Sequence, residues 1–109
     1  MAFDEAIAAR LRAALARRRG IEERRMFGGL AFLAGGHMAC GVVDAKLMVR
    51  VGPDGHADAL RQPHARPMDF TGKPLRGFVY VEAPGFAADA DLEAWIARAL
   101  EFVRALPPK

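Results

Sequence analysis

The sequence predicts an α+β fold: a two-layer sandwich in which an antiparallel sheet carries an N-terminal and a C-terminal helix on one face. Two observations predict this class. Apolar residues repeat at helical spacing near both ends of the chain, whereas short segments separated by glycine or proline turns fill the middle. The chain has 109 residues, enough for one domain with a modest core, so we expect residues 1–109 to form a single domain.

The N-terminal helix is predicted over residues 3–19. Its apolar stripe recurs every four positions, at Phe3, Ile7, Leu11 and Leu15. Gly20 is a natural end for this helix, because glycine readily adopts the left-handed conformation that terminates many helices.

An antiparallel meander of about three strands is predicted next. The strands cover residues 21–33, with an interruption at Gly28-Gly29, then His37–Val43, then Lys46–Val51. Tight turns at Ala34-Gly35-Gly36 and Asp44-Ala45 connect them.

The second half of the chain predicts one or two further strands and the closing helix. The expected elements are a short helix at His56–Arg61, an irregular proline-rich segment at residues 62–74, a strand at Leu75–Glu82, and a helix that ends near Leu106. Asp89 or Asp91 is expected to cap the closing helix. Its buried stripe consists of Leu92, Trp95, Ile96, Ala99, Val103 and Leu106.

Both faces of the predicted sheet carry apolar side chains. In the strand at Leu75–Glu82, the residues expected to oppose Phe78 and Tyr80 are Leu75, Val79 and Val81. In the strand at His37–Val43, the residues expected to oppose Ala39 and Val43 are Met38, Cys40 and Val42. We therefore expect the proline-rich segment or another subunit to cover the face that has no helix.

Composition narrows the class of protein. The net charge of +3 is too small to indicate nucleic-acid binding by itself, and a solvated arginine-rich helix face is the commoner explanation. Cys40 is the only cysteine, which fits a reducing cytoplasm. The start is acidic, no signal peptide is recognisable, and no apolar run is long enough for a membrane helix. We expect a cytoplasmic protein that does not bind membranes.

Few residues of the sequence indicate catalysis or metal binding. The sequence contains no serine, so a serine nucleophile is excluded. Metal ligands would have to come from His37, Cys40, His56 and His64, whose spacing fits no zinc motif. His37 and Cys40 lie three apart on a predicted strand and should leave opposite faces. We expect Cys40 to be a core residue, and we expect no metal, no cofactor and no catalytic residue.

The segment RRMFGGLAF, Arg24 to Phe32, contains two adjacent glycines. A phosphate-binding loop needs glycines that open onto a helix N-terminus, whereas Gly28-Gly29 lead into a predicted strand. We therefore expect a bulge or a close backbone approach there. Met26 and Phe27 are expected core anchors, with Arg24 and Arg25 at the rim of the junction.

Two groups of residues remain candidates for binding. The first consists of Arg24, Arg25, Arg50, Arg66, Arg76, Phe78 and Tyr80. It forms either a platform for single-stranded nucleic acid or a rim of arginines around a packed aromatic face. The second consists of His64, Arg66, Asp69 and Arg50. It forms either a small-molecule or acid–base site, or a loop that an Arg66–Asp69 ion pair organises.

Three blocks in order resemble the N-terminal domain of the TfoX/Sxy family of competence regulators. They are Met26-Phe27-Gly28-Gly29, Leu47-Met48-Val49-Arg50-Val51 and Pro67-Met68-Asp69-Phe70-Thr71-Gly72. The similarity extends from Arg24 to Val81. It implies a small two-layer domain with an antiparallel sheet, similar to secretion-chaperone-like folds.

The resemblance also implies a function. Known members of that family regulate DNA-uptake genes in bacteria, and they are thought to act with a cyclic-AMP receptor-type transcription factor rather than through a DNA-reading motif. Those members carry a second, C-terminal domain, which we expect to be absent here. We therefore expect a non-enzymatic regulatory module, related to transcription, that binds another protein or a second copy of itself. The alternative is the small-molecule or enzymatic site of the second group above.

Overall fold

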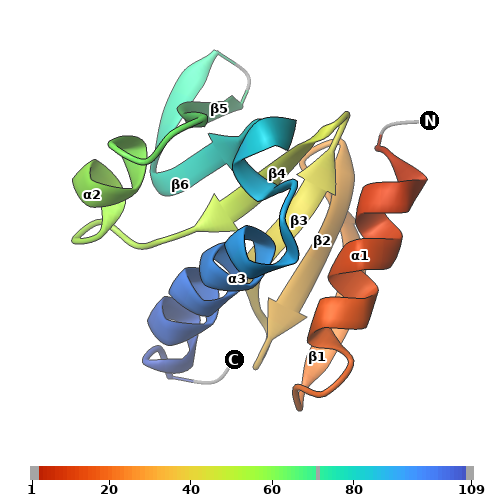
Figure 1. Cartoon of the computed structure of the whole chain (residues 1–109). Coiled ribbons are helices and arrows are strands. Elements are labelled where there is room, and N and C mark those ends of the chain that lie inside the picture. Colours follow the sequence, from red (N-terminus) through yellow and green to blue (C-terminus); the bar gives the residue numbers. More distant parts are fainter. Residues whose placement is uncertain (1–2, 71, 108–109) are drawn as a thin grey trace.

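A computed structural model describes residues 3–70 and 72–107, and its elements form one α+β domain (Figure 1). The helices are α1 (Glu5–Leu15), α2 (His56–Leu60), the 3₁₀ helix η1 (Ala83–Phe86) and α3 (Asp89–Arg104). The strands are β1 (Ile21–Met26), β2 (Gly29–Ala34), β3 (His37–Val43), β4 (Lys46–Arg50), β5 (Ala65–Phe70) and β6 (Lys73–Val81). They form a six-stranded sheet in the order β1-β2-β3-β4-β6-β5, antiparallel throughout.

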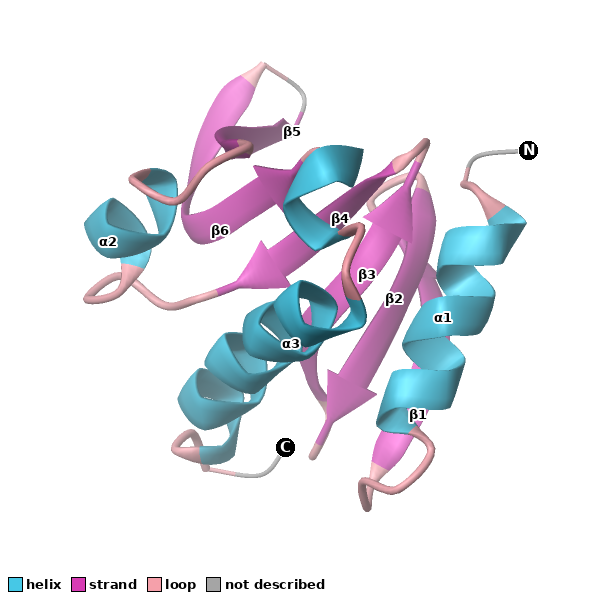
Figure 2. Ribbon diagram, in the orientation of Figure 1, coloured by secondary structure: helices cyan, strands magenta, loops and turns pink. Residues whose placement is uncertain are grey.

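The helices α1 and α3 lie on one face of this sheet, which confirms the predicted two-layer sandwich (Figure 2). The helix α3 packs on β3 and β4, and the short helix α2 lies beside β5 and β6. We call the covered side the helix face. Its core is aliphatic apart from a few larger rings, and its most buried members include Leu11, Phe32, Val42, Leu47, Val49, Val79, Phe86 and Ile96.

The helix α1 begins two residues later and ends four residues earlier than the predicted range of residues 3–19. The carboxylate of Asp4 accepts hydrogen bonds from the backbone N–H groups of Ala6 and Ile7, at 2.8 and 3.1 Å, which caps the first turn. The helix stops at Leu15 rather than at residue 19. The guanidinium of Arg18 then donates to the carbonyl of Ala14, so the arginine side chain takes the place of the next helical N–H group.

The junction at Gly28-Gly29 is a hairpin turn and not an interruption within one strand. The backbone reverses at Phe27 and Gly28, whose φ angles are +56° and +75°, and β1 pairs with β2 in antiparallel register from Ile21↔Ala34 to Met26↔Gly29. The meander therefore has four strands, β1 to β4, instead of about three. A short alternating segment cannot by itself distinguish a bulge from a two-residue turn.

The proline-rich segment is not irregular. Residues Ala65–Phe70 form β5, which pairs with β6. Because β5 is the last strand of the sheet, Pro67 can sit at the edge without breaking a ladder on both sides. The start of the closing helix α3 also differs from expectation. Ala88 is the N-cap residue and no side chain caps the helix, so the predicted cap by Asp89 or Asp91 is wrong.

Two irregularities change which face certain residues occupy. The pairing of β2 with β3 shifts between Phe32 and Leu33, so Ala39 is inserted and lies with Cys40 in the helix-face core, while Met38 turns to the opposite side. In β6, Gly77 adopts a φ of +88°, and Leu75 joins the side of Phe78 and Tyr80. The predicted alternation is therefore wrong at Met38, Ala39 and Leu75.

The sheet side opposite the helices holds a second apolar cluster, which we call the methionine face. Its buried centre consists of Ala31, Leu33, Met38, Val43, Met48 and Met68. Its half-buried rim consists of Met26, Phe27, Leu75, Phe78 and Tyr80. Every methionine of the described residues lies on this side.

The methionine face is closed largely by the curl of the sheet itself. Phe27 lies in the β1–β2 turn and Phe78 on β6, at least three strand spacings apart, which is about 14 Å on a flat sheet. Their ring centroids are 6.2 Å apart. The sheet therefore bends its corners toward each other, and the proline-rich segment supplies Met68 to this face rather than a covering loop.

Candidate functional site

The predicted residues at the β1–β2 turn line a shallow hollow on the rim of the methionine face. The hollow measures about 360 Å³ and is lined by Arg25, Met26, Phe27, Gly28 and Gly29. Gly29 is required by a close approach, because a Cβ there would run into the carbonyl of Val42 on β3. This confirms the expected close backbone approach at the second glycine.

Aromatic rings and basic side chains alternate along this rim. The rings of Phe27 and Phe78 meet edge to face, with an interplanar angle of 61°. The ammonium of Lys46 lies 4.5 Å from the ring centroid of Tyr80, and the guanidinium of Arg50 lies 5.4 Å from that of Phe78. These cation–π contacts hold both rings in place while leaving them half exposed.

The five predicted arginines do not form one platform. The guanidinium of Arg25 lies over the ring of Phe3, 5.5 Å from its centroid, and that of Arg66 pairs with Glu82 at 3.4 Å. Arg24 and Arg76 are exposed. Of the predicted set, Arg50 alone contacts one of the predicted aromatic rings, Phe78.

The second candidate group is not brought together either. His64 faces a groove between α3 and η1, whereas Arg50 lies at the far end of β4 beside Phe78. The backbone carbonyl of Asp69 accepts a hydrogen bond from the Tyr80 hydroxyl at 3.4 Å. The expected Arg66–Asp69 ion pair is wrong, because Arg66 pairs with Glu82 on the neighbouring strand.

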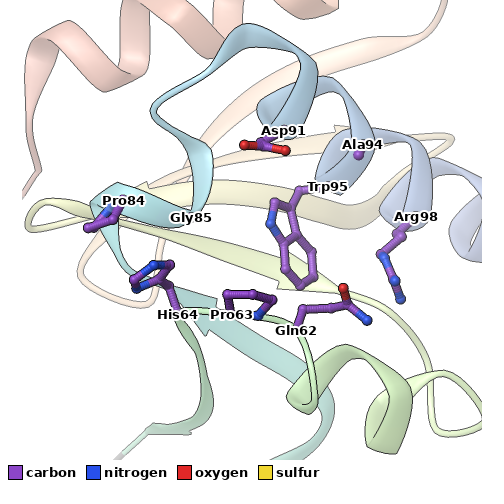
Figure 3. A pocket seen from close by; sticks show the side chains of 9 residues that line it. All are labelled: Gln62, Pro63, His64, Pro84, Gly85, Asp91, Ala94, Trp95 and Arg98. Atoms are coloured by element: carbon purple, nitrogen blue, oxygen red, sulfur yellow. The ribbon is translucent and has the colours of Figure 1, made fainter.

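The groove beside His64 was not expected from the sequence. It measures about 330 Å³, and its lining comes from three segments that the fold brings together: Gln62, Pro63, His64, Pro84, Gly85, Asp91, Ala94, Trp95 and Arg98. Figure 3 shows the Trp95 ring between Asp91 and the Gln62–Pro63 segment. The one sequence signal for it is the spacing of Asp91, Trp95 and Arg98, which repeats along one side of α3.

Two polar side chains that line this groove, Gln62 and Arg98, bond to Asp58, which lies outside the lining. Arg98 lies over the Trp95 ring, 5.3 Å from its centroid, and its Nη1 is 3.0 Å from a carboxylate oxygen of Asp58. The hydrogen bonds from Arg98 and Arg61 lower the pKa of Asp58. His64 has a left-handed φ of +67°, stabilised by the hydrogen bond from Glu82 N–H to its carbonyl at 2.9 Å. Asp58 balances the charge of Arg98.

The residues considered as metal ligands are spread over the molecule. The Nε2 atom of His37 lies 2.6 Å from the carbonyl of Pro107, Cys40 is buried in the helix-face core, and His56 begins α2. The inserted Ala39 places Cys40 on the helix side, and His37 reaches the end of α3 on that same side, so the expected separation of these two by opposite faces is wrong. No group of three potential ligands is found among residues 3–70 and 72–107.

Burial makes Cys40 a core residue, as predicted. Its side chain is 1% exposed, and desolvation raises the pKa of its thiol to about 12. A thiol with that pKa carries almost no thiolate at neutral pH, so it is a poor nucleophile and a poor metal ligand.

In the part of the chain that the structure describes, no helix has the length and apolar character to cross a membrane.

Comparison with protein-family models identifies the family of the chain. No curated protein matches the chain. The family model described as the TfoX N-terminal domain matches residues 13–103, a range that includes every strand, α2 and nearly all of α3. The chain belongs to the TfoX N-terminal domain family.

Proposed function

We propose that this protein is a non-enzymatic regulatory module that binds another protein through the rim of the methionine face. The observation that carries the proposal is the set of half-buried apolar side chains on this rim, Met26, Phe27, Phe78 and Tyr80, of which the first two line the hollow at the β1–β2 turn. These side chains are only half buried, although larger apolar groups usually find a place inside a domain of this size. Family membership suggests that the regulation concerns competence.

The composition of the rim suits protein binding. Aromatic residues, methionine and arginine are enriched at the centres of protein interfaces. Methionine adapts its shape to different neighbours because it is unbranched and polarizable. The centre of this face, with Met38, Met48 and Met68 nearly fully buried, gives the rim a deformable support.

Charge favours a partner that carries an acidic side chain. Basic and acidic side chains both lie beside the apolar rim, and two of the basic ones are paired: Lys46 lies 3.9 Å from Asp44, and Arg66 lies 3.4 Å from Glu82. The half-buried Arg50 has no carboxylate within 4 Å among the described residues. A partner protein that presents an apolar segment with an acidic side chain fits this guanidinium.

Two other functions receive less support. The small-molecule or enzymatic alternative required His64, Arg66, Asp69 and Arg50 to converge, and these residues lie apart. Direct nucleic-acid binding required a continuous basic and aromatic platform, whereas Arg25 and Arg66 are engaged elsewhere. A role in transcription would then come through the bound protein.

The test compares three versions of the chain as baits in an extract of the producing cell. They are the wild type, Phe78→Glu on the rim, and Ala97→Glu on the exposed side of α3. A protein bound by the wild type and by Ala97→Glu is purified, and its affinity is measured by calorimetry. We expect Phe78→Glu to weaken binding by at least about tenfold, because it places a charge in the apolar contact.

Folding and self-association are checked in the same experiment. Circular dichroism shows whether Phe78→Glu retains the fold, and Tyr80→Glu provides a second rim variant. Equal binding of the purified protein to the wild type and to both rim variants would overturn the proposal. A homodimer in analytical ultracentrifugation that Phe78→Glu dissociates would show that the occupant is a second copy.

A further inference from the structure

One arginine at the edge of the methionine face is held between two aromatic rings. The guanidinium carbon of Arg50 lies 5.4 Å from the ring centroid of Phe78 on β6 and 5.4 Å from that of Phe102 on α3. Gly52 permits this arrangement, because it has a φ of +82° and a Cβ there would collide with the Phe102 ring. The guanidinium is therefore held between two separate elements, β6 and α3.

The charge of Arg50 has no counterion within the described part of the chain. The other half-buried arginines are each within 4 Å of a carboxylate: Arg10 with Asp89, Arg18 with Glu93, and Arg98 with Asp58. Arg50 makes one long hydrogen bond, 3.4 Å, to the carbonyl of Met38. Burial lowers its pKa. A guanidinium that is partly desolvated and unpaired is costly unless an anion reaches it.

We propose that Arg50 receives the carboxylate of an acidic side chain on the protein that docks against the methionine face, an inference that rests on the proposed function. The planar fork of N–H donors matches a carboxylate, and the rings fix its orientation before binding. One guanidinium balances one carboxylate charge, whereas a phosphate dianion would need further donors. Arg50 thus selects acidic over neutral partners.

The test uses defined probes, so that it does not depend on knowing the partner. The probes are acetate, exchanged for chloride at constant ionic strength, and a terminally blocked peptide of alternating leucine and glutamate. A leucine–glutamine peptide serves as the neutral counterpart. Side-chain Nε–Hε NMR signals of arginine and methionine methyl signals are followed in the wild type, Arg50→Gln, Arg50→Lys and Arg17→Gln, the last being an exposed arginine without a described partner.

We expect acetate to shift the Arg50 signal in a saturable manner while the Arg17 signal moves little. The acidic peptide should bind the wild type and Arg17→Gln equally and Arg50→Gln at least about tenfold more weakly, since a charge-assisted contact is lost. Arg50→Lys should fall between them, because it keeps the charge and loses the fork. Equal binding of the acidic peptide to all variants, or an Arg50 signal that follows Arg17, would overturn the inference.

The outcomes separate this inference from the proposed function. If both peptides shift the methionine methyl signals but Arg50→Gln changes neither affinity, the docking face stands and the role of Arg50 is wrong. If acetate shifts Arg50 and neither peptide shifts the methionine signals, the carboxylate site stands and docking at this face is contradicted. Thermal unfolding of each variant, expected within a few degrees of the wild type, shows that loss of binding is not loss of fold.

Discussion

The two faces of the sheet are built from the same strands and yet differ in how they are closed. The helix face is covered by α1 and α3, and its side chains are mostly aliphatic and almost fully buried. The methionine face has no helix, and its closure depends on the contact between Phe27 and Phe78. From this comparison we infer that the helix face provides most of the stability, whereas the rim of the methionine face is the surface proposed to bind a partner.

Truncation within the helix face should have the largest effect. Ile96 is 1% exposed and lies between α3 and the sheet. Ile96→Ala should lower the free energy of unfolding by about 2–5 kcal/mol, because it removes buried surface and leaves a cavity. Urea denaturation measures the loss. The matched change on the other face, Leu75→Ala at the half-buried rim, should lower the free energy of unfolding by less than half as much. An equal loss would contradict the inference that the helix face provides most of the stability.

Overpacking the centre of the methionine face should come next. A Cβ at Gly41 would lie 2.9 Å from the methyl carbon of Met48 and would collide with the carbonyl of Leu30. Gly41→Ala should therefore destabilise the domain by about 1–3 kcal/mol. Gly35→Ala is the control, since no atom lies near its Cβ, although its left-handed φ adds a smaller backbone cost. If Gly41→Ala is no worse than Gly35→Ala, this centre is looser than described.

The buried thiol of Cys40 should make the helix face sensitive to alkali. Its pKa is raised to about 12 in the folded chain from 9.0, so between these values the unfolded state binds fewer protons. Stability should then fall by about 1.4 kcal/mol for each pH unit above pH 9. The unfolding free energy of the wild type and of Cys40→Ala, compared from pH 8 to 11, isolates this slope. Parallel pH profiles of the wild type and Cys40→Ala would show that the Cys40 thiol is not buried in solution.

The contact that closes the methionine face should have the smallest effect. The Phe27–Phe78 pair is expected to contribute about 0.5–1.5 kcal/mol beyond its buried area, as edge-to-face pairs do. A double-mutant cycle with Phe27→Ala, Phe78→Ala and the double variant measures this coupling. Additive effects would mean that the rings do not meet in solution and that the sheet is flatter than described.

Local sequence patterns predicted most elements but neither the curvature of the sheet nor the face on which every residue lies. The helical stripes, the turns at Gly35 and Asp44, and the burial of Cys40 follow from spacing and composition. The strand β5 was missed because Pro67 reads as a breaker, and only the edge position in the assembled sheet makes it acceptable. The faces of Met38 and Leu75 were wrong because a single inserted residue or a left-handed glycine reverses the alternation.

The candidate site was predictable as a set of residues and not as an arrangement. Phe27, Phe78, Tyr80 and Arg50 were all named from the sequence, but nothing local indicates that a turn after β1 reaches β6. Arg66 and Asp69 are close in sequence, which favoured an ion pair, whereas the strand places Glu82 nearer to Arg66. Phe102, the second ring at Arg50, has no sequence signal at all because it belongs to a distant helix.

Site-specific crosslinking in the producing cell tests most directly whether the methionine face is the docking surface. A p-benzoylphenylalanine is placed at the position of Phe78 or, as control, at that of Ala97 on α3. The account predicts one crosslinked product with a different protein from position 78, its loss when Phe27→Glu is added, and no such product from position 97. Products from position 97 alone, or a position-78 product that persists with Phe27→Glu, would contradict it.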